Sequence, residues 1–458
     1  VATPDLPLPR LLRLSLFQVS VGMTMVLLVG TLNRVMIVEL DVPASMVGLM
    51  IALPLVFAPF RALIGFNSDH HQSVLGWRRV PFIWKGSLAQ FSGFAIMPLA
   101  LLVLAGKGES GSWPVWVGQG SAALAFLLVG AGMHTVQTTG LALATDLTPS
   151  ASHPKVVGLM YVMLLLGMIG SAMVYGALLA DFSHARLVQV IQGTAVVVLA
   201  LNGLAMWKQE VRRPRRGQTE PAPDPTFRES WAVFAKGDHT TRRLVIIGLG
   251  TLGFGLADVL LEPFGGQILH LSVGDTTQLT ALFAVGGLSG FATASHLLNR
   301  GGDAYRVSGL GVLLGVPGFA LVLSASSLGL VGPFLLGNFL IGFGGALFGH
   351  GTLTVTMNRA PKDQVGLALG AWGSVQATAA GVAMASSGVL RDLVDALAGG
   401  GRIAVGYNAV YAIEIALLLG TLWLLLPLWG RATVSPSKAR AVEGVAEPAL
   451  GASARDAR

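Results

Sequence analysis

The sequence predicts an all-α membrane protein with twelve transmembrane helices in two six-helix halves. Apolar residues make up 53% of the chain and charged residues only 12%, which is too little charge to cover a soluble globule of 458 residues. Apolar runs recur along the chain, and one long hydrophilic stretch separates the sixth run from the seventh. The chain contains no cysteine, so disulfides, thiol nucleophiles and cysteine metal sites are excluded.

Each apolar run is expected to form one membrane-spanning helix. The hydrocarbon core of a bilayer is about 30 Å thick and needs about 20 helical residues to cross. The opening VATPDLPLPRLLRL lacks the charged start and cleavage site of a secretory signal, so the first span is expected to direct targeting. The predicted spans cover residues 15–40, 44–66, 82–106, 114–142, 155–180, 186–207, 243–270, 277–298, 305–326, 330–357, 364–388 and 404–430.

The hydrophilic stretch after the sixth span reads VRRPRRGQTEPAPDPTF and is typical of a linker. We predict five segments. They are a cytoplasmic N-terminus (1–13), an N-terminal six-helix half (14–207), a cytoplasmic linker (208–242), a C-terminal six-helix half (243–430) and a disordered cytoplasmic tail (431–458). Similar stretches, VELDVPAS (38–45) and LHLSVGDT (269–276), lie at the end of the first span of each half and favour a parallel repeat with a cavity between the halves.

The basic residues predict the orientation of the spans, because Lys and Arg concentrate on the side that is not translocated. With the N-terminus inside, all but five of the 30 Lys and Arg residues fall on the cytoplasmic side. Both termini are therefore expected to be cytoplasmic. The net charge of +7 reflects this asymmetry and an attraction to anionic membrane lipids. Nucleic-acid binding would need a soluble basic domain, and the sequence contains none. The five exceptions are Arg34, Lys107, Arg186, Arg391 and Arg402.

The loop between the second and third spans, RALIGFNSDHHQSVLGWRRVPFIWK, carries a carboxylate before an arginine pair. Asp69, Arg78 and Arg79 resemble the pattern in the same loop of major facilitator transporters. A carboxylate can cap the N-terminus of a helix, and guanidinium groups bind carboxylates in a fork. We expect this loop to fix the cytoplasmic ends of neighbouring helices. Asn67 and the pair His70–His71 depart from the transporter pattern and weaken the case for alternating access.

Four acidic residues lie within predicted spans, where an unpaired charge is costly. Glu39 lies near the outer end of the first span, five residues after Arg34, with which it can pair. Asp258 and Glu262 are four residues apart and are expected to share one face of the seventh span.

Pro263, Gly265 and Gly266 are expected to break the seventh span just beyond Glu262. The fourth acid, Glu414, lies inside the last span. In a transporter, Asp258, Glu262 and Glu414 would bind protons or cations. In a structural role they would pair with a basic group or bond to neighbouring backbone.

Two histidines occupy related places in the two halves. His134 lies twelve residues before Asp146, which places it about 18 Å into the fourth span. His350 lies in the tenth span, shifted by about one turn. Gly, Ala and Thr surround both residues, and a neutral imidazole is a suitable axial ligand for a magnesium tetrapyrrole. The alternative is a histidine that is hydrogen-bonded across helices to a partner such as Gln137.

Several segments together resemble the PucC/LhaA-type light-harvesting complex assembly proteins, the bacteriochlorophyll delivery family within the major facilitator superfamily. The likeness covers nearly all of the chain except the linker and the tail. It is carried by LNRVMIVELDVPA (32–44), RALIGFNSDHHQSVLGWRRVPFIW (61–84), HTVQTTGLALATDLTP (134–149), YVMLLLGM (161–168), DVLLEPFGGQIL (258–269) and YAIEIALLLGTL (411–422).

The resemblance implies the major facilitator fold and a role in assembling the antenna of a purple bacterium. Implied ligands are bacteriochlorophyll, with carotenoid or lipid as further candidates. Implied partners are the light-harvesting alpha and beta polypeptides, the reaction centre–antenna core complex, enzymes of bacteriochlorophyll synthesis and membrane lipids. The location would be the bacterial inner membrane or its intracytoplasmic photosynthetic part. The implied roles are pigment ligation through magnesium for His134 or His350, a structural latch for Asp69, Arg78, Arg79 and Asp146, and polar contacts for Glu39, Asp258, Glu262 and Glu414.

Two other classes of function compete with the assembly factor. A proton-coupled small-molecule transporter of the major facilitator type is the alternative, and it would depend on Asp258 or Glu262. An enzyme of pigment synthesis is disfavoured, because the sequence shows no diphosphate-binding acidic pair, no nucleotide-binding loop and no Cys or His metal set.

Overall fold

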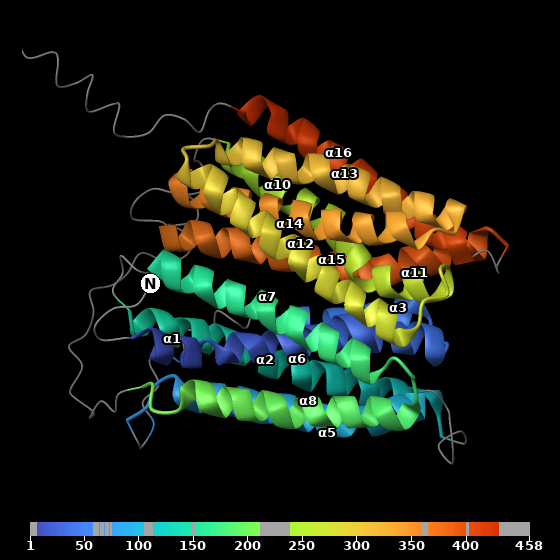
Figure 1. The fold of residues 1–458 in the computed structure, drawn as a ribbon, viewed down its shortest axis with the longest axis horizontal. Coiled ribbons are helices and arrows are strands. Elements are labelled where there is room, and N and C mark those ends of the chain that lie inside the picture. Colours follow the sequence, from blue (N-terminus) through green and yellow to red (C-terminus); the bar gives the residue numbers. More distant parts are fainter. Residues whose placement is uncertain are drawn as a thin grey trace, which may run out of the picture.

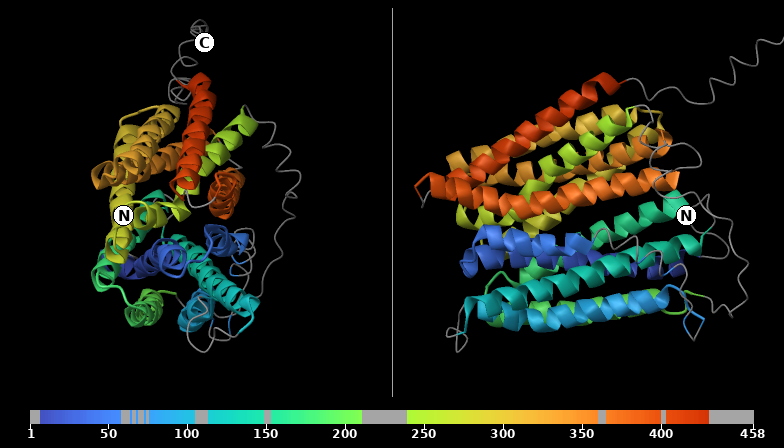
Figure 2. Two further views of the ribbon diagram at one scale, coloured as in Figure 1. Left: turned by 90° about the vertical axis from the view of Figure 1, so that its right-hand side faces the viewer. Right: turned by 180° about the vertical axis from the view of Figure 1, so that it is seen from behind.

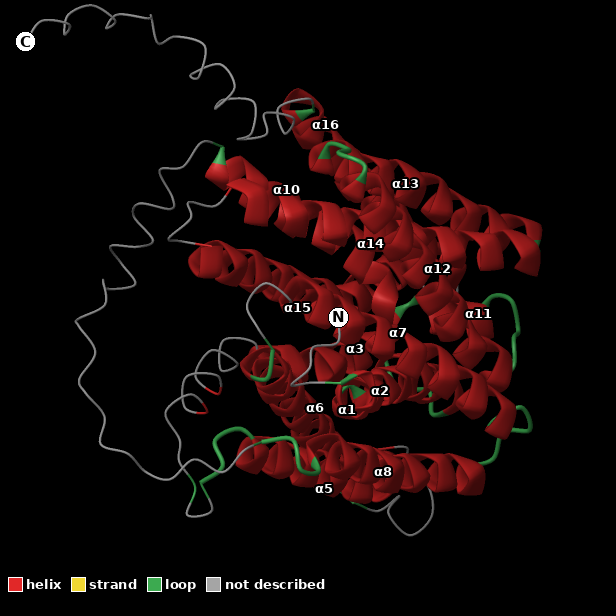
Figure 3. Cartoon of the chain, turned by 60° about the vertical axis from the view of Figure 1, so that its left-hand side comes forward, coloured by secondary structure: helices red, strands yellow, loops and turns green. Residues whose placement is uncertain are grey.

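The computed structural model describes residues 7–57, 64, 68, 73, 76–104, 113–148, 153–210, 239–359, 365–399 and 403–429. Within these ranges every regular element is a helix (Figure 3), which confirms the predicted all-α class. Ten helices in this part of the chain are long and apolar enough to cross a membrane. The remaining two predicted spans correspond to a shorter apolar helix after residue 43 and to the helix that begins at Val365.

The first group of helices, up to residue 210, contains the first six predicted spans. The first span is continuous from Leu8 to Glu39. The bounds are α1 (Leu8–Leu14), α2 (Leu16–Met25), η1 (Val26–Leu32), η2 (Val35–Glu39), α3 (Ala44–Ala52), η3 (Leu53–Phe57), α5 (Val80–Leu104), α6 (Val115–Asp146), α7 (His153–Leu178) and α8 (His184–Met206).

The second group, from residue 239, contains the other six predicted spans. Capping side chains mark its helix starts: Ser272 and Asp275 form a capping box on α12, and Asp303 accepts from the backbone N–H of Tyr305 on α13. The bounds are α10 (Thr240–Gly255), η6 (Leu256–Val259), α11 (Leu261–Gln267), α12 (Val273–Asn299), α13 (Ala304–Leu328), α14 (Val331–Arg359), α15 (Val365–Leu397), α16 (Ile403–Leu425) and η7 (Leu426–Leu428).

The helices run side by side, and the two groups lie next to each other (Figures 1 and 2). We call the end at which α1 begins, α8 ends and α10 begins the linker end, which is on the left in Figure 1. The opposite end, which holds residues 39–44 and 267–273, is the far end. Residues 1–6, most of the linker and the tail lie outside the described residues, so the predicted domain boundaries stay a prediction.

The part of the first span toward the far end is wound as a π-helix. In η2 the backbone N–H of Leu40 donates to the carbonyl of Val35, five residues earlier, at 3.0 Å. π-helical turns are rare and are frequent at functional sites. Winding by five residues brings the side chains of Arg34 and Glu39 together, and the two form an ion pair. The predicted pairing therefore occurs, and the π-helix explains how residues five apart can meet.

The two groups of helices are joined toward the far end. Among the described residues, the hydrogen bonds between the two groups involve three residues in the second half of the first span and one at the start of α3. They are Thr31, Asn33, Arg34 and Ser45. α3 packs against α15, and α7 packs against α12. At the far end the Gly176 and Gly274 backbones approach so closely that a methyl group on Gly176 would stand 3.0 Å from the carbonyl oxygen of Gly274.

Candidate functional site

Glu262 lies at the seam between the two groups of helices. Its side chain is only 5% exposed, and its Oε1 accepts a hydrogen bond from the Thr280 hydroxyl of α12. Gly30 of η1 faces this carboxylate, and a methyl group there would stand 2.5 Å from Oε1 of Glu262. The other oxygen, Oε2, has no hydrogen-bond partner among the described residues. The Glu262 carboxylate of the second group therefore packs directly against the first group at Gly30, where the residue has no side chain.

Arg34 lies on the same seam. It is 4% exposed, pairs with Glu39 and donates from Nη2 to the carbonyl of Leu271 across the seam at 3.2 Å. Gly266, one turn after Glu262 on α11, leaves room for this guanidinium, since a methyl group there would stand 3.1 Å from Arg34 Nε. Next to it, Asn33 donates to the Val259 carbonyl at 2.6 Å. Arg34 thus bridges its own helix and the far end of the second group.

The seventh span breaks earlier than the sequence predicts. The break is the 3-10 turn η6 (Leu256–Val259), whereas Pro263, Gly265 and Gly266 all lie inside α11. Proline has no backbone N–H and is tolerated in the first turn of a helix, where that N–H has no intrahelical acceptor. Asp258 and Glu262 therefore belong to two different elements, and the expectation that they share one face of a continuous helix is wrong. Glu262 bonds to Thr280 of α12, whereas Asp258 lies in the turn η6, which packs against α16.

Glu414 has no basic partner in the described part of the chain. Its side chain is fully buried, and no donor lies within hydrogen-bond distance of either carboxylate oxygen there, although the Ala257 backbone lies beside it. Of the two structural alternatives, a basic partner is therefore missing among the described residues, whereas the neighbouring Ala257 backbone is compatible with the second, a bond to neighbouring backbone.

The two histidines differ in their surroundings. His134 is 7% exposed and lies one turn from Gly130, whose Cα hydrogen faces Pro54 so closely that a methyl group there would overlap the proline ring. His350 is half-buried on α14, and its ring meets the edge of the Phe291 ring at a centroid distance of 4.4 Å. Its Nδ1 has no hydrogen-bond partner in the described residues, and a methyl group on the adjacent Gly349 would meet nothing within 4 Å. The space next to His350, at Gly349, is therefore more open than the space one turn from His134, at Gly130.

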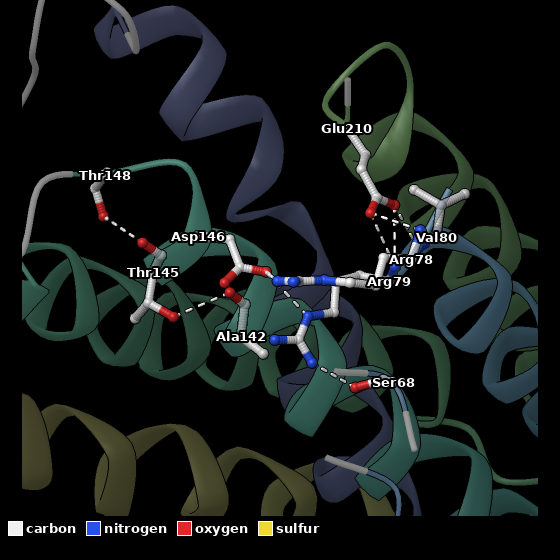
Figure 4. A network of polar contacts seen from close by, with 9 residues as sticks. All are labelled: Ser68, Arg78, Arg79, Val80, Ala142, Thr145, Asp146, Thr148 and Glu210. Carbon is white, nitrogen blue, oxygen red and sulfur yellow. Dashed lines mark hydrogen bonds and ion pairs between the residues drawn. The ribbon is translucent and has the colours of Figure 1, made fainter. Parts of the chain in front are cut away.

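The predicted arginine latch forms at the linker end (Figure 4). Oδ2 of Asp146, the last residue of α6, accepts from Arg78 Nη2 at 2.6 Å and from Arg79 Nε at 3.0 Å. Arg79 is 4% exposed and also donates to the Ser68 hydroxyl at 2.5 Å. Two guanidinium groups that precede α5 are thereby fixed to the end of α6. Asp69, the remaining predicted member, lies outside the described residues.

Sequence reasoning missed Glu210, the other carboxylate of this network. Its Oε1 accepts from the backbone N–H groups of Arg78 at 2.7 Å and Arg79 at 3.0 Å, and its Oε2 accepts from that of Val80 at 2.9 Å (Figure 4). The next residue, Pro81, has no N–H. Glu210 therefore satisfies the donors at the start of α5 and places a negative charge at the positive end of that helix.

Replacing Glu210 with alanine is expected to loosen the start of α5. The loss of a helix-capping carboxylate costs about 1–2 kcal/mol, because the freed N–H groups lose their acceptor and the helix dipole loses its counter-charge. Hydrogen exchange measured by mass spectrometry should show faster exchange at Arg78–Val80. Glu210→Gln, which keeps an acceptor without the charge, should have a smaller effect, and the exposed Lys208→Ala should have none. Equal exchange in all four proteins would contradict the capping role.

A second network that the sequence did not reveal lies at the far end. Arg391 of α15 donates to Gln267 Oε1 at 3.1 Å and pairs with Asp392 at 2.6 Å. The Tyr407 hydroxyl donates to the same Gln267 oxygen at 2.8 Å. Asp392 in turn accepts from the backbone N–H of Ser45 at 2.8 Å. Three helices of the second group are thus tied to the start of α3 in the first.

The chain matches the family model described as "PUCC protein" over residues 31–433. Protein PucC of Rhodovulum sulfidophilum is 62% identical over 395 residues, which cover 86% of this chain and 87% of the relative. Protein PucC of Rhodobacter capsulatus is 58% identical over 436 residues, which cover 94% of each chain.

Solved structures show the same fold at low sequence identity. A nucleoside transporter aligns with a TM-score of 0.66 and 13% identity over 92% of this chain and all of the transporter. A bacterial homologue of the iron transporter ferroportin, in its inward-facing state, aligns with a TM-score of 0.65 and 15% identity over 91% of this chain and 97% of the homologue. The predicted fold class is confirmed, and this chain is a multi-pass membrane protein of the PUCC family with the fold of major facilitator transporters.

Proposed function

We propose that this protein is an assembly factor for the light-harvesting complex of a purple bacterium. In this role it chaperones the alpha and beta antenna polypeptides, delivers bacteriochlorophyll to them, or does both, around the reaction centre. The observation that carries the proposal is the sequence likeness to named PucC proteins over most of both chains. The solved transporters share only the fold, at 13–15% identity, so transport of their substrates does not follow.

The proposal assigns no catalytic step to the chain. It places the protein in the inner membrane or its intracytoplasmic photosynthetic part, with both termini in the cytoplasm. The concentration of Lys and Arg at the ends of the predicted spans supports this orientation. The latch of Arg78, Arg79, Asp146 and Glu210 then lies at the cytoplasmic surface and fixes the ends of α5, α6 and α8.

His350 fits a pigment ligand better than His134. A magnesium tetrapyrrole supplies a metal ion that accepts one axial lone pair, and a neutral imidazole supplies that lone pair without adding charge. Nδ1 of His350 has no competing hydrogen bond in the described residues, the space beside Gly349 is open, and Phe291 holds the ring from one side. His134 lies in a more closely packed part of α6. We therefore propose His350 on α14 as the first candidate for the pigment ligand and His134 as the second.

The proposal is tested by isolating the tagged protein in mild detergent from a phototroph that makes pigment. We expect near-infrared bacteriochlorophyll absorption and co-purifying antenna polypeptides. His350→Ala should lose most of the pigment absorption and keep the polypeptides, because ligation and helix docking use different groups. The exposed His296→Ala on α12 is the matched control and should behave as the unchanged protein.

A colourless protein without antenna polypeptides would refute the assembly role. The next measurement would then be substrate flux in proteoliposomes, with Glu262→Gln as the test of the transporter alternative. Pigment that is lost in His134→Ala but kept in His350→Ala would move the ligand from α14 to α6.

A further inference from the structure

The ion pair at the far end of the first span depends on how the backbone is wound there. Arg34 and Glu39 pair across five residues that include η2. In an α-helix, residues five apart point about 140° away from each other, whereas π-helical bonding places them one turn apart. The hydrogen bond from the backbone N–H of Leu40 to the carbonyl of Val35 is of this π-helical type. The partner of Arg34 is therefore held in place by the π winding of η2.

A second carboxylate lies across the seam, about one helical turn from the Arg34 guanidinium. A methyl group on Gly266 would stand 3.1 Å from both Nε and Nη2 of Arg34. A methyl group on Gly30 would stand 2.5 Å from Oε1 of Glu262. Gly266 follows Glu262 by four residues on α11, just as Arg34 follows Gly30 by four residues on the first span. Each charged side chain thus lies against a glycine of the opposite group of helices, about 5.4 Å apart along α11.

Both charged groups keep one unused hydrogen-bonding atom. Arg34 is 4% exposed, and its Nε has no partner among the described residues. Glu262 is 5% exposed, and its Oε2 also has no partner in that part of the chain, since Thr280 binds only Oε1. A buried donor and a buried acceptor of opposite charge are therefore left over on the two sides of one seam, and such atoms are costly until they gain a partner.

The hydrogen bonds described above that cross the seam each have at least one neutral partner. Arg34 itself donates across it to the Leu271 carbonyl. Its charge is neutralised by Glu39 within the first group, so the two groups can part here without breaking this ion pair. A bond from Arg34 to Glu262 would instead join the groups through a buried ion pair, and parting them would leave a buried charge without its partner.

We propose that Arg34 is a switch that exchanges Glu39 for Glu262 and thereby locks the two groups of helices together. While η2 is wound as a π-helix, Arg34 binds Glu39, and the seam can part. When η2 takes up α-helical winding, Glu39 turns away, and the Nε–H of Arg34 becomes a donor to Oε2 of Glu262. The flexible methylene stem of arginine lets the guanidinium cover one helical turn. The switch involves no pigment, so the inference does not depend on the proposed function.

The exchange is tested by thermal unfolding of Glu39→Gln, Glu262→Gln and the double variant in mild detergent. Each single change leaves Arg34 one carboxylate, whereas the double change leaves it buried with none. The drop in the unfolding midpoint of the double variant should therefore exceed the sum of the two single drops, by about 2–4 °C. In an Arg34→Gln background this excess should vanish, because the group that both acids serve is gone. Additive drops would overturn the proposal.

A cysteine reporter separates the switch from a purely structural ion pair. The chain contains no cysteine, so Thr277→Cys places a single thiol at a fully buried position on the seam. Its rate of reaction with a small thiol reagent measures how often the seam parts. Glu39→Gln should slow the reaction by about fivefold or more, because Arg34 then locks onto Glu262.

Two further variants complete the reporter experiment. The slowing should disappear when Glu262→Gln is added to Glu39→Gln, because the lock has lost its acceptor. Asp181→Asn is the matched control and should leave the rate unchanged, because Asp181 is 93% exposed and pairs with Arg186 away from the seam. A reaction that is equally fast or faster in Glu39→Gln would overturn the proposal, since Glu39 would then only stabilise the closed seam.

Discussion

Gly388→Ala is expected to lower the free energy of unfolding by about 2–3 kcal/mol, because it adds a methyl group where two helix backbones touch. Gly388 of α15 faces the start of α3 so closely that the new methyl would overlap the carbonyl of Ala44 and stand 2.7 Å from the backbone nitrogen of Ser45. Backbone atoms cannot rotate away, so the helices must separate. The separation also strains the hydrogen bond from Ser45 to Asp392, which joins the two groups of helices.

The matched control, Gly193→Ala, is expected to change the free energy of unfolding in the opposite direction. Gly193 of α8 is exposed, and a methyl group there meets nothing within 4 Å. Gly193→Ala should raise the free energy of unfolding by about 0.5–1 kcal/mol, because alanine is the better helix former. Thermal unfolding in mild detergent compares the two variants. If Gly388→Ala also proves stabilising, α3 and α15 do not approach as closely as the structure shows.

The positions of the spans follow from the sequence because the bilayer imposes a length. The predicted third span at residues 82–106 becomes α5 at Val80–Leu104, and the predicted sixth at 186–207 becomes α8 at His184–Met206. The same holds for the membership of Arg78, Arg79 and Asp146 in one latch, because a family pattern names these positions, although it does not say which side chains pair. The bilayer thickness sets the length of a span, and the positions of the apolar runs are read directly from the sequence, so few other assignments of the spans are possible.

The contacts that shape the candidate site could not be predicted in the same way. Glu210 caps α5 from 130 residues along the chain, and nothing in the stretch around it distinguishes it from a solvated charge before a linker. The seventh span breaks at η6, which packs against α15 and α16, whereas the sequence pointed to Pro263. Local patterns report helix propensity and length, but long-range contacts decide which helix end is capped and where a helix bends.

Asp146→Ala is expected to lower the free energy of unfolding by about 2–3 kcal/mol, because the buried Arg79 and the neighbouring Arg78 lose the charged acceptor that fixes them to the end of α6. Arg79 is 4% exposed, so the lost hydrogen bond to Asp146 is not readily replaced by bulk water. The expected loss lies below that of a fully buried ion pair, because the side chain of Asp146 is 33% exposed and water compensates part of the charge. Thermal or denaturant unfolding of the purified protein measures the change.

An exposed pair of the same chemistry provides the control. Arg186 and Asp181 lie 3.4 Å apart with exposed fractions of 47% and 93%, so Asp181→Ala should change stability by about 0–1 kcal/mol. Asp146→Asn keeps an acceptor for Arg79 and should fall between the two. Equal losses in Asp146→Ala and Asp181→Ala would mean that the latch is an ordinary surface ion pair. A clearly larger loss in Asp146→Ala would show that burial of Arg79 makes this carboxylate necessary for holding α5 and α6 together.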